Sequence, residues 1–301
     1  MFKKLKPWLS AFRLRTLPLS VSGIIIGSCF AHFYGAFDGW IMCFALLVTV
    51  SLQVLSNLAN DYGDSEKGTD NENRVGPMRA VQSGEISAAE MYEGIKVNII
   101  IVIILTVGLL LAAFGQKQLH FTVLFFSLSI LSIYAAIKYT VGSSPYGYRG
   151  LGDVFVFLFF GILSGVGSYF LYTKSLDHII ILPSIALGLL SVGVLNLNNM
   201  RDIESDELSN KRTLAVKLGK GNSKIYHLTI VILAMVVGMV FSVLYFKSFL
   251  NLIFLITYIP LLIHIKKIYR AVEPKDFDSQ LKVLALTTFG FSLLLGLGYI
   301  L

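Results

Sequence analysis

Two acidic clusters carry the clearest chemical pattern in the chain. The first reads NLANDYGD over residues 57–64, and the second reads NNMRDIESD over residues 198–206. Asn60 and Asp64 are four residues apart, and Asn198, Asp202 and Asp206 repeat the same spacing. Side chains at that spacing share one face of a helix, so each cluster is expected to present a row of oxygen ligands.

Oxygen ligands of this kind indicate a magnesium and phosphate site. Carboxylates four residues apart on a helix repel each other, and a bound cation removes that cost. Mg²⁺ prefers oxygen ligands and often takes one or two carboxylates together with phosphate oxygens of a substrate. The two clusters are therefore expected to hold one diphosphate through metal ions. Basic residues near the clusters, or on the same side of the membrane, can neutralise the remaining phosphate oxygens: Arg74, Arg79, Lys138, Lys211 and Arg212.

The elements that must position these clusters are membrane helices. Hydrophobic residues make up 55% of the 301 residues and charged residues 14%, which excludes a soluble globular domain. Apolar runs of about 20 residues, enough to cross the hydrocarbon of a bilayer, recur nine times. We expect an all-α membrane protein formed by a single domain over residues 1–301. The predicted spans are 17–34, 40–59, 95–114, 120–138, 153–172, 179–198, 226–246, 249–265 and 283–300.

The charges predict how these spans are oriented. All lysines and arginines except Lys117, Lys174 and Lys247 fall before the first span or after an even-numbered one. Basic loops face the cytoplasm, so the N-terminus is expected to be cytoplasmic. Residues 60–94 and 199–225 then become cytoplasmic active-site loops. The net charge of +7 reflects this topology and contact with the lipid bilayer, and no basic stripe typical of nucleic-acid binding is present.

The positions of the clusters also predict an internal repeat. They follow the second and the sixth span, so two direct repeats of four helices, followed by one helix, would place them equivalently. An ion-coupled membrane transporter is the alternative of another class. Transporters place ionisable residues near the middle of the membrane, whereas here they lie at the ends of spans.

The chain resembles the UbiA-type membrane prenyltransferase superfamily over nearly its whole length. The resemblance rests on LRTLPL at 14–19, the stretch 57–79, YTVG at 139–142, PYGYRGLGD at 145–153 and the stretch 198–213. Within the superfamily, these motifs are most similar to the branch that prenylates 1,4-dihydroxy-2-naphthoate in menaquinone synthesis. Many members carry a third acidic residue four positions after the one matching Asp64. Here that position is Gly68, and the next carboxylate is Asp70.

The resemblance implies a Mg²⁺-dependent transferase in the cell membrane with its active site facing the cytoplasm. It would move a polyprenyl group from polyprenyl diphosphate to 1,4-dihydroxy-2-naphthoate with decarboxylation, and another acceptor such as 4-hydroxybenzoate is the alternative. Asn60, Asp64, Asp202 and Asp206 are the implied catalytic residues, and together with Asp70 they are the implied metal ligands. The implied substrate contacts are Asn57, Asp61, Lys67, Arg74, Arg79, Lys138, Tyr139, Tyr148, Arg149, Asn198, Lys211 and Arg212.

Overall fold

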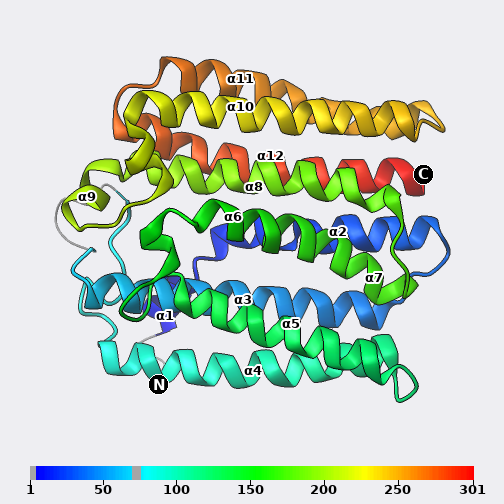
Figure 1. The fold of residues 1–301 in the computed structure, drawn as a ribbon, viewed down its shortest axis with the longest axis horizontal. Coiled ribbons are helices and arrows are strands. Elements are labelled where there is room, and N and C mark those ends of the chain that lie inside the picture. The colour runs from blue at the N-terminus through cyan, green and yellow to red at the C-terminus, as the bar shows by residue number, and fades with distance from the viewer. Residues whose placement is uncertain (1–4, 70–75) are drawn as a thin grey trace.

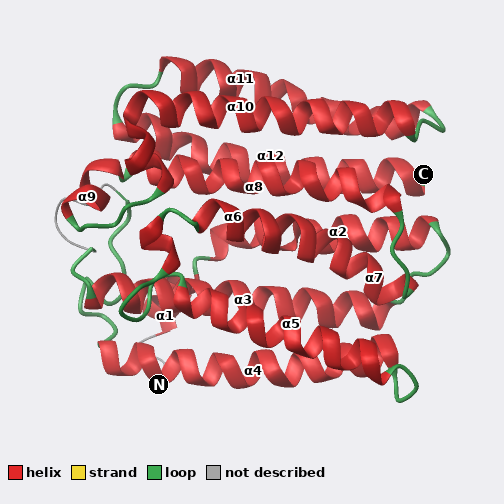
Figure 2. Cartoon of the chain, in the orientation of Figure 1, coloured by secondary structure: helices red, strands yellow, loops and turns green. Residues whose placement is uncertain are grey.

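The computed structural model describes residues 5–69 and 76–301, and all regular structure in this part of the chain is helical (Figure 2). The α-helices are α1 (Leu5–Phe12), α2 (Leu17–Phe33), α3 (Gly39–Glu66), α4 (Ala88–Phe114), α5 (Leu119–Lys138), α6 (Gly152–Val156), α7 (Ser168–Thr173), α8 (Ile181–Arg201), α9 (Ile203–Leu208), α10 (Leu214–Leu244), α11 (Tyr258–Arg270) and α12 (Pro274–Ile300). The 3-10 or π-helical segments are η2 (Leu14–Thr16), η3 (Tyr146–Arg149), η4 (Phe157–Gly167), η5 (His178–Ile180) and η6 (Phe249–Thr257). The predicted all-α class is confirmed.

Nine helical stretches of the described residues are long and apolar enough to cross a membrane. They are Leu5–Phe33, Gly39–Glu66, Ala88–Phe114, Leu119–Lys138, Gly152–Thr173, His178–Arg201, Leu214–Leu244, Phe249–Arg270 and Pro274–Ile300. Each predicted span matches one of them. The helices reach further than predicted at the end that carries the acidic clusters, so Asn60 to Glu66 lie on α3 rather than in a loop.

The long helices run side by side, so that the two acidic clusters meet at one end of the bundle. In Figure 1 the ends of α3 and α8, the whole of α9 and the connection from α5 to α6 gather at the left. The connections between α2 and α3, α4 and α5, and α10 and η6 lie at the opposite end. The fold therefore brings together charged segments that are far apart in the sequence.

An aromatic cluster packs α2 against α10 and α12. Phe30 of α2 contacts Phe241 of α10 and Tyr299 of α12, with ring centroids 5.7 Å and 5.2 Å apart. Phe30 and Phe241 are fully buried. Because aromatic pairs at these distances contribute beyond the area they bury, this cluster fixes α2 against α10 and α12.

Small residues allow the π-helical segment η4 to pack directly on α8. A methyl group added to Gly161 would lie 2.6 Å from the Cα of Gly188, and one added to Gly165 would lie 2.2 Å from Ser184 Oγ. Close helix contact through small residues is a common means of packing membrane helices. Since η4 also lines the central cavity described below, this contact sets the width of the site.

Gly161→Ala is expected to destabilise the bundle by about 1–3 kcal/mol, because the added carbon meets the backbone of α8 rather than a movable side chain. Thermal denaturation of the detergent-purified protein measures this loss. Gly39→Ala is the matched control, since a methyl group there meets nothing within 4 Å. Equal melting temperatures for both variants would contradict the packing described here.

Candidate active site

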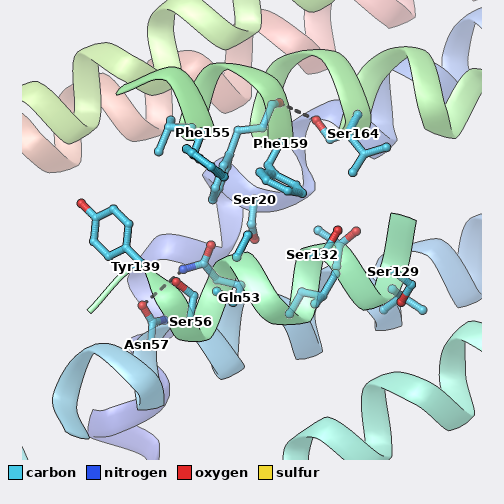
Figure 3. Close-up of a pocket in the computed structure, with 18 of the residues that line it drawn as sticks. Ser20, Gln53, Ser56, Asn57, Ser129, Ser132, Tyr139, Phe155, Phe159 and Ser164 are labelled. Carbon is cyan, nitrogen blue, oxygen red and sulfur yellow. Dashed lines mark hydrogen bonds between the residues drawn. The ribbon is translucent and has the colours of Figure 1, made fainter. Parts of the chain in front are cut away.

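A cavity of about 340 Å³ enters the bundle at the end where the acidic clusters meet. Its outer end is polar, and the lining residues there are Arg13, Asn60, Asp64, Arg79, Asn198, Asn199 and Lys211. Further into the bundle the walls are mostly apolar or aromatic, with Ile24, Val48, Leu52, Leu109, Phe155 and Phe159 among the lining residues (Figure 3). The cavity thus joins a charged head to an apolar interior.

Asp64 is the most heavily contacted carboxylate at the polar end. It is buried, and its Oδ2 lies 3.3 Å from Arg79 Nη2 and 4.0 Å from Lys211 Nζ. Its Oδ1 accepts a hydrogen bond of 2.8 Å from the Tyr148 hydroxyl. Burial raises the pKa of Tyr148, and the neighbouring Asp64 adds to this, so the phenol remains a donor.

The second cluster lies on two helices rather than one. The sequence predicted a continuous helix through residues 198–206, but α8 ends at Arg201 and α9 begins at Ile203. Asp202 lies between them with φ −99° and ψ 13°. Backbone hydrogen bonds from Asp202 to Asn198 (3.1 Å) and from Asp206 to Asp202 (2.8 Å) keep the four-residue spacing across the break.

Lys211 links the two clusters. Its Nζ lies 3.3 Å from Asp206 Oδ1 and 4.0 Å from Asp64 Oδ2, and it sits 5.5 Å from the centroid of the Tyr148 ring. Burial lowers the pKa of Lys211, but the carboxylates of Asp64 and Asp206 outweigh this and raise it above its usual value. A lysine that is firmly charged therefore stands between the acidic side chains of α3 and α9.

Asp206 provides the test of whether a cation fits here. Its Oδ2 is buried and has no hydrogen-bond partner among the residues that the structure describes. Burial outweighs Lys211 and raises the pKa of Asp206 to about 6. A buried carboxylate oxygen without a partner is costly, and a divalent cation that takes oxygen ligands would remove that cost. The residues at this end therefore fit Mg²⁺.

Protein carboxylates alone do not complete such a site. Within residues 5–69 and 76–301, no three His, Cys, Asp or Glu side chains stand close enough together to hold a metal ion. Asn60 lines the cavity, and its Oδ1 accepts a hydrogen bond of 3.3 Å from Thr140. The remaining ligands would have to be amide, water or phosphate oxygens, as is usual for Mg²⁺ bound with a phosphorylated substrate.

Asp202, a predicted ligand, is held by an arginine that the sequence did not single out. Arg201 donates from Nε and Nη2 to the two oxygens of Asp202 at 2.8 and 2.6 Å, and its Nη1 lies 2.6 Å from Asp278 of α12. Its Nη2 also donates to Asn198 Oδ1 at 2.7 Å. With a side chain only 1% exposed, Arg201 positions both Asp202, which does not line the cavity, and Asn198, which does.

Asn57 and Asp61 anchor the N-terminal segment to α3. Asn57 Nδ2 donates to the Phe12 carbonyl at 3.0 Å and to Thr16 Oγ1 at 3.4 Å. Asp61 is buried and pairs with Arg13 and with Arg79, whose Nη1 is 3.1 Å away. Asp61 does not line the cavity, so it positions two arginines that do.

The other predicted contact residues fall into three groups. Tyr139 and Asn198 line the cavity. Four basic residues do not line it: Lys67, which donates to the Gly142 carbonyl at 2.7 Å, Arg149, which donates to Ser144 Oγ at 3.2 Å, Lys138, and the exposed Arg212. Asp70 and Arg74 lie outside the described residues. Among the lining residues that were not predicted, three carry a charged or amide side chain: Arg13, Gln53 and Asn199.

Comparisons with known proteins agree with this architecture. The model of the UbiA prenyltransferase family matches residues 20–295. The chain is 40% identical to 1,4-dihydroxy-2-naphthoate octaprenyltransferase of Haemophilus influenzae, over 98% of this chain and 96% of that protein. It is 42% identical to the Escherichia coli protein of the same name, over 89% of this chain and 86% of that one.

Solved structures share the fold. A UbiA homolog from Archaeoglobus fulgidus, bound to DMAPP and Mg²⁺, superposes with a TM-score of 0.67 at 14% identity, covering 98% of this chain and 99% of that one. Since the family model spans most of the chain and two relatives exceed a third identity over nearly its full length, the protein belongs to the UbiA prenyltransferase family.

Proposed function

We propose that the protein transfers a polyprenyl group from an allylic diphosphate to 1,4-dihydroxy-2-naphthoate, releasing diphosphate and carbon dioxide. The observation that carries the proposal is Lys211, which joins the two acidic clusters at the charged head of an otherwise apolar cavity. The relatives of that name support the choice of acceptor over 4-hydroxybenzoate. Family membership favours a transferase over a transporter.

The charged head would bind the diphosphate. Asn60, Asp64, Asp202 and Asp206 would hold Mg²⁺, with Asp70 a further candidate ligand. Bound Mg²⁺ supplies Lewis-acid stabilisation of the leaving diphosphate. Lys211 and Arg79 add positive charge where negative charge grows as the allylic C–O bond breaks. The same two side chains neutralise Asp64 when no substrate is bound.

The apolar part of the cavity would hold the prenyl chain and the reacting carbon. Bond cleavage leaves an allylic cation, which the electron-rich naphthoate ring attacks through carbon, and loss of the carboxylate as carbon dioxide restores the aromatic ring. Aromatic rings line this region and can stabilise the cation by their faces. The apolar walls keep water from capturing it.

The distribution of charge supports a cytoplasmic active site. The polar end of the cavity coincides with the end that carries the basic loops, and the N-terminal helix α1 is tied to it through Asp61. By the positive-inside rule this end faces the cytoplasm. The first cluster lies at the end of α3, and the second lies at the end of α8 and on α9; two direct repeats of four helices would relate them.

Prenyl transfer by the purified protein tests the proposal. A long allylic diphosphate is supplied with 1,4-dihydroxy-2-naphthoate or with 4-hydroxybenzoate, in Mg²⁺ or in chelator. Product from the naphthoate in Mg²⁺ alone is the expected result. Product from the benzoate alone would move the protein to another branch of the family, and no product from either acceptor would overturn the proposal.

A further inference from the structure

We infer that the Gln53 side chain accepts a hydrogen bond from the free ring hydroxyl of the aromatic acceptor. This inference rests on the proposed function and deepens it. Gln53 lies on α3 and lines the cavity, where Ser20, Ser56 and Asn57 are its labelled neighbours (Figure 3). It precedes Asn60 by seven residues, which is about 10 Å along a helix axis. This separation leaves room for a diphosphate at the charged head and a ring beside Gln53.

The hydrogen bonds of Asn57 fix how the Gln53 amide is turned. The Phe12 carbonyl can only accept a hydrogen bond, so Asn57 must direct its Nδ2 toward Phe12. Asn57 Oδ1 then faces Gln53 and accepts from Gln53 Nε2 at 3.3 Å, the dashed line beside Asn57 in Figure 3. This orientation leaves the Gln53 carbonyl oxygen as the one acceptor that the amide offers to a ligand, beside the second hydrogen of Nε2.

Among residues 5–69 and 76–301, no side chain or backbone group donates to that carbonyl oxygen, and the only hydrogen bond of the Gln53 side chain is the one to Asn57. The nearby Ser20 hydroxyl, also in the cavity wall, already donates to the Leu17 carbonyl at 2.9 Å. A carbonyl oxygen in the cavity wall favours a ligand that donates a hydrogen bond, because a bound ligand without a donor would cover the oxygen and leave it unpaired.

The wall opposite Gln53 is suited to a flat ring. Phe155 and Phe159 stand across the cavity from it in Figure 3, with ring centroids 6.2 Å apart and planes 17° from parallel. Tyr146 stacks on Phe155 with centroids 3.9 Å apart and so holds its orientation. A planar hydroxylated ring would have aromatic faces on one side and the Gln53 oxygen at its edge.

The chemistry of the acceptor identifies which of its hydroxyls can donate to Gln53. In 1,4-dihydroxy-2-naphthoate, the 1-hydroxyl is beside the carboxylate and bonds to it internally. The 4-hydroxyl is the free donor. A hydrogen bond from that hydroxyl to Gln53 would orient the ring and leave more electron density on its oxygen as the ring attacks the allylic carbon.

The test measures how each protein discriminates between two acceptors. The 4-methyl ether of the naphthoate, which lacks the donor, is compared with the parent compound as substrate and as competitive inhibitor. The wild type should bind the ether about tenfold more weakly than the parent. Gln53→Met should raise the KM for the parent about tenfold and bind the ether and the parent with similar affinity. Its KM for the prenyl diphosphate should stay within about twofold of the wild-type value.

Each outcome has one meaning. If the wild type binds the ether and the parent equally well, the inference is wrong, whether or not the variant folds. It is also wrong if Gln53→Met still prefers the parent to the ether as strongly as the wild type does. Gln118→Met, the same change at the opposite end of the bundle, controls for the substitution itself. Failure of the wild type to prenylate the parent naphthoate at all would instead refute the proposed function.

Discussion

Asp64→Asn is expected to reduce prenyl transfer by on the order of 10³-fold while the protein still inserts and folds. The substitution keeps the size of the side chain and its ability to accept the Tyr148 hydrogen bond. It removes the negative charge that Arg79 and Lys211 share, and with it one proposed Mg²⁺ ligand. Steady-state transfer of a radiolabelled polyprenyl group to the naphthoate in purified membranes measures the effect.

Asp38→Asn is the matched control for this variant. Asp38 is the N-cap residue of α3, at the opposite end of the bundle. Its Oδ1 accepts hydrogen bonds from the backbone N–H groups of Trp40 and Ile41. Asparagine serves as well as aspartate at such a position, so activity should be unchanged. Near-wild-type turnover by Asp64→Asn in Mg²⁺ would show that the metal assignment is wrong.

The helices could be predicted from the sequence because their pattern is local. Nine apolar runs of membrane length and a one-sided distribution of lysine and arginine required no knowledge of tertiary contacts. The proposal that Asp64 and Asp206 are ligands is also local, because it rests on their spacing from other oxygen side chains. The exact helix ends were less predictable, since α3 and α8 continue through polar segments that were predicted to be loops.

The partners of these residues could not be predicted, because they come from distant segments. Arg201 stands beside Asp202 in sequence, yet its second carboxylate partner, Asp278, lies on α12. In the sequence, Arg13 is only one of several basic residues near the N-terminus. Its ion pair with Asp61 is seen only in the folded structure. Gln53 stands alone within an apolar run, and only the cavity shows that its side chain faces inward.

Lys211→Met is expected to separate the two roles of this side chain. During transfer the lysine stabilises the departing diphosphate, so its loss should lower kcat by about 10²–10³-fold. Without substrate the lysine neutralises Asp64 and Asp206, which lie 4.0 and 3.3 Å from its Nζ. Removing it leaves two buried carboxylates with less compensation, which Mg²⁺ would then supply.

The variant should therefore gain more thermal stability from Mg²⁺ than the wild type does, although it is far less active. Melting temperatures with and without Mg²⁺, in the absence of prenyl diphosphate, measure this gain because a ligand that binds only the folded state raises its stability. Lys266→Met, an exposed lysine of α11, should change neither quantity. A variant that lost activity but showed the wild-type response to Mg²⁺ would mean that Lys211 acts on the diphosphate alone and does not compete with the cation for the two carboxylates.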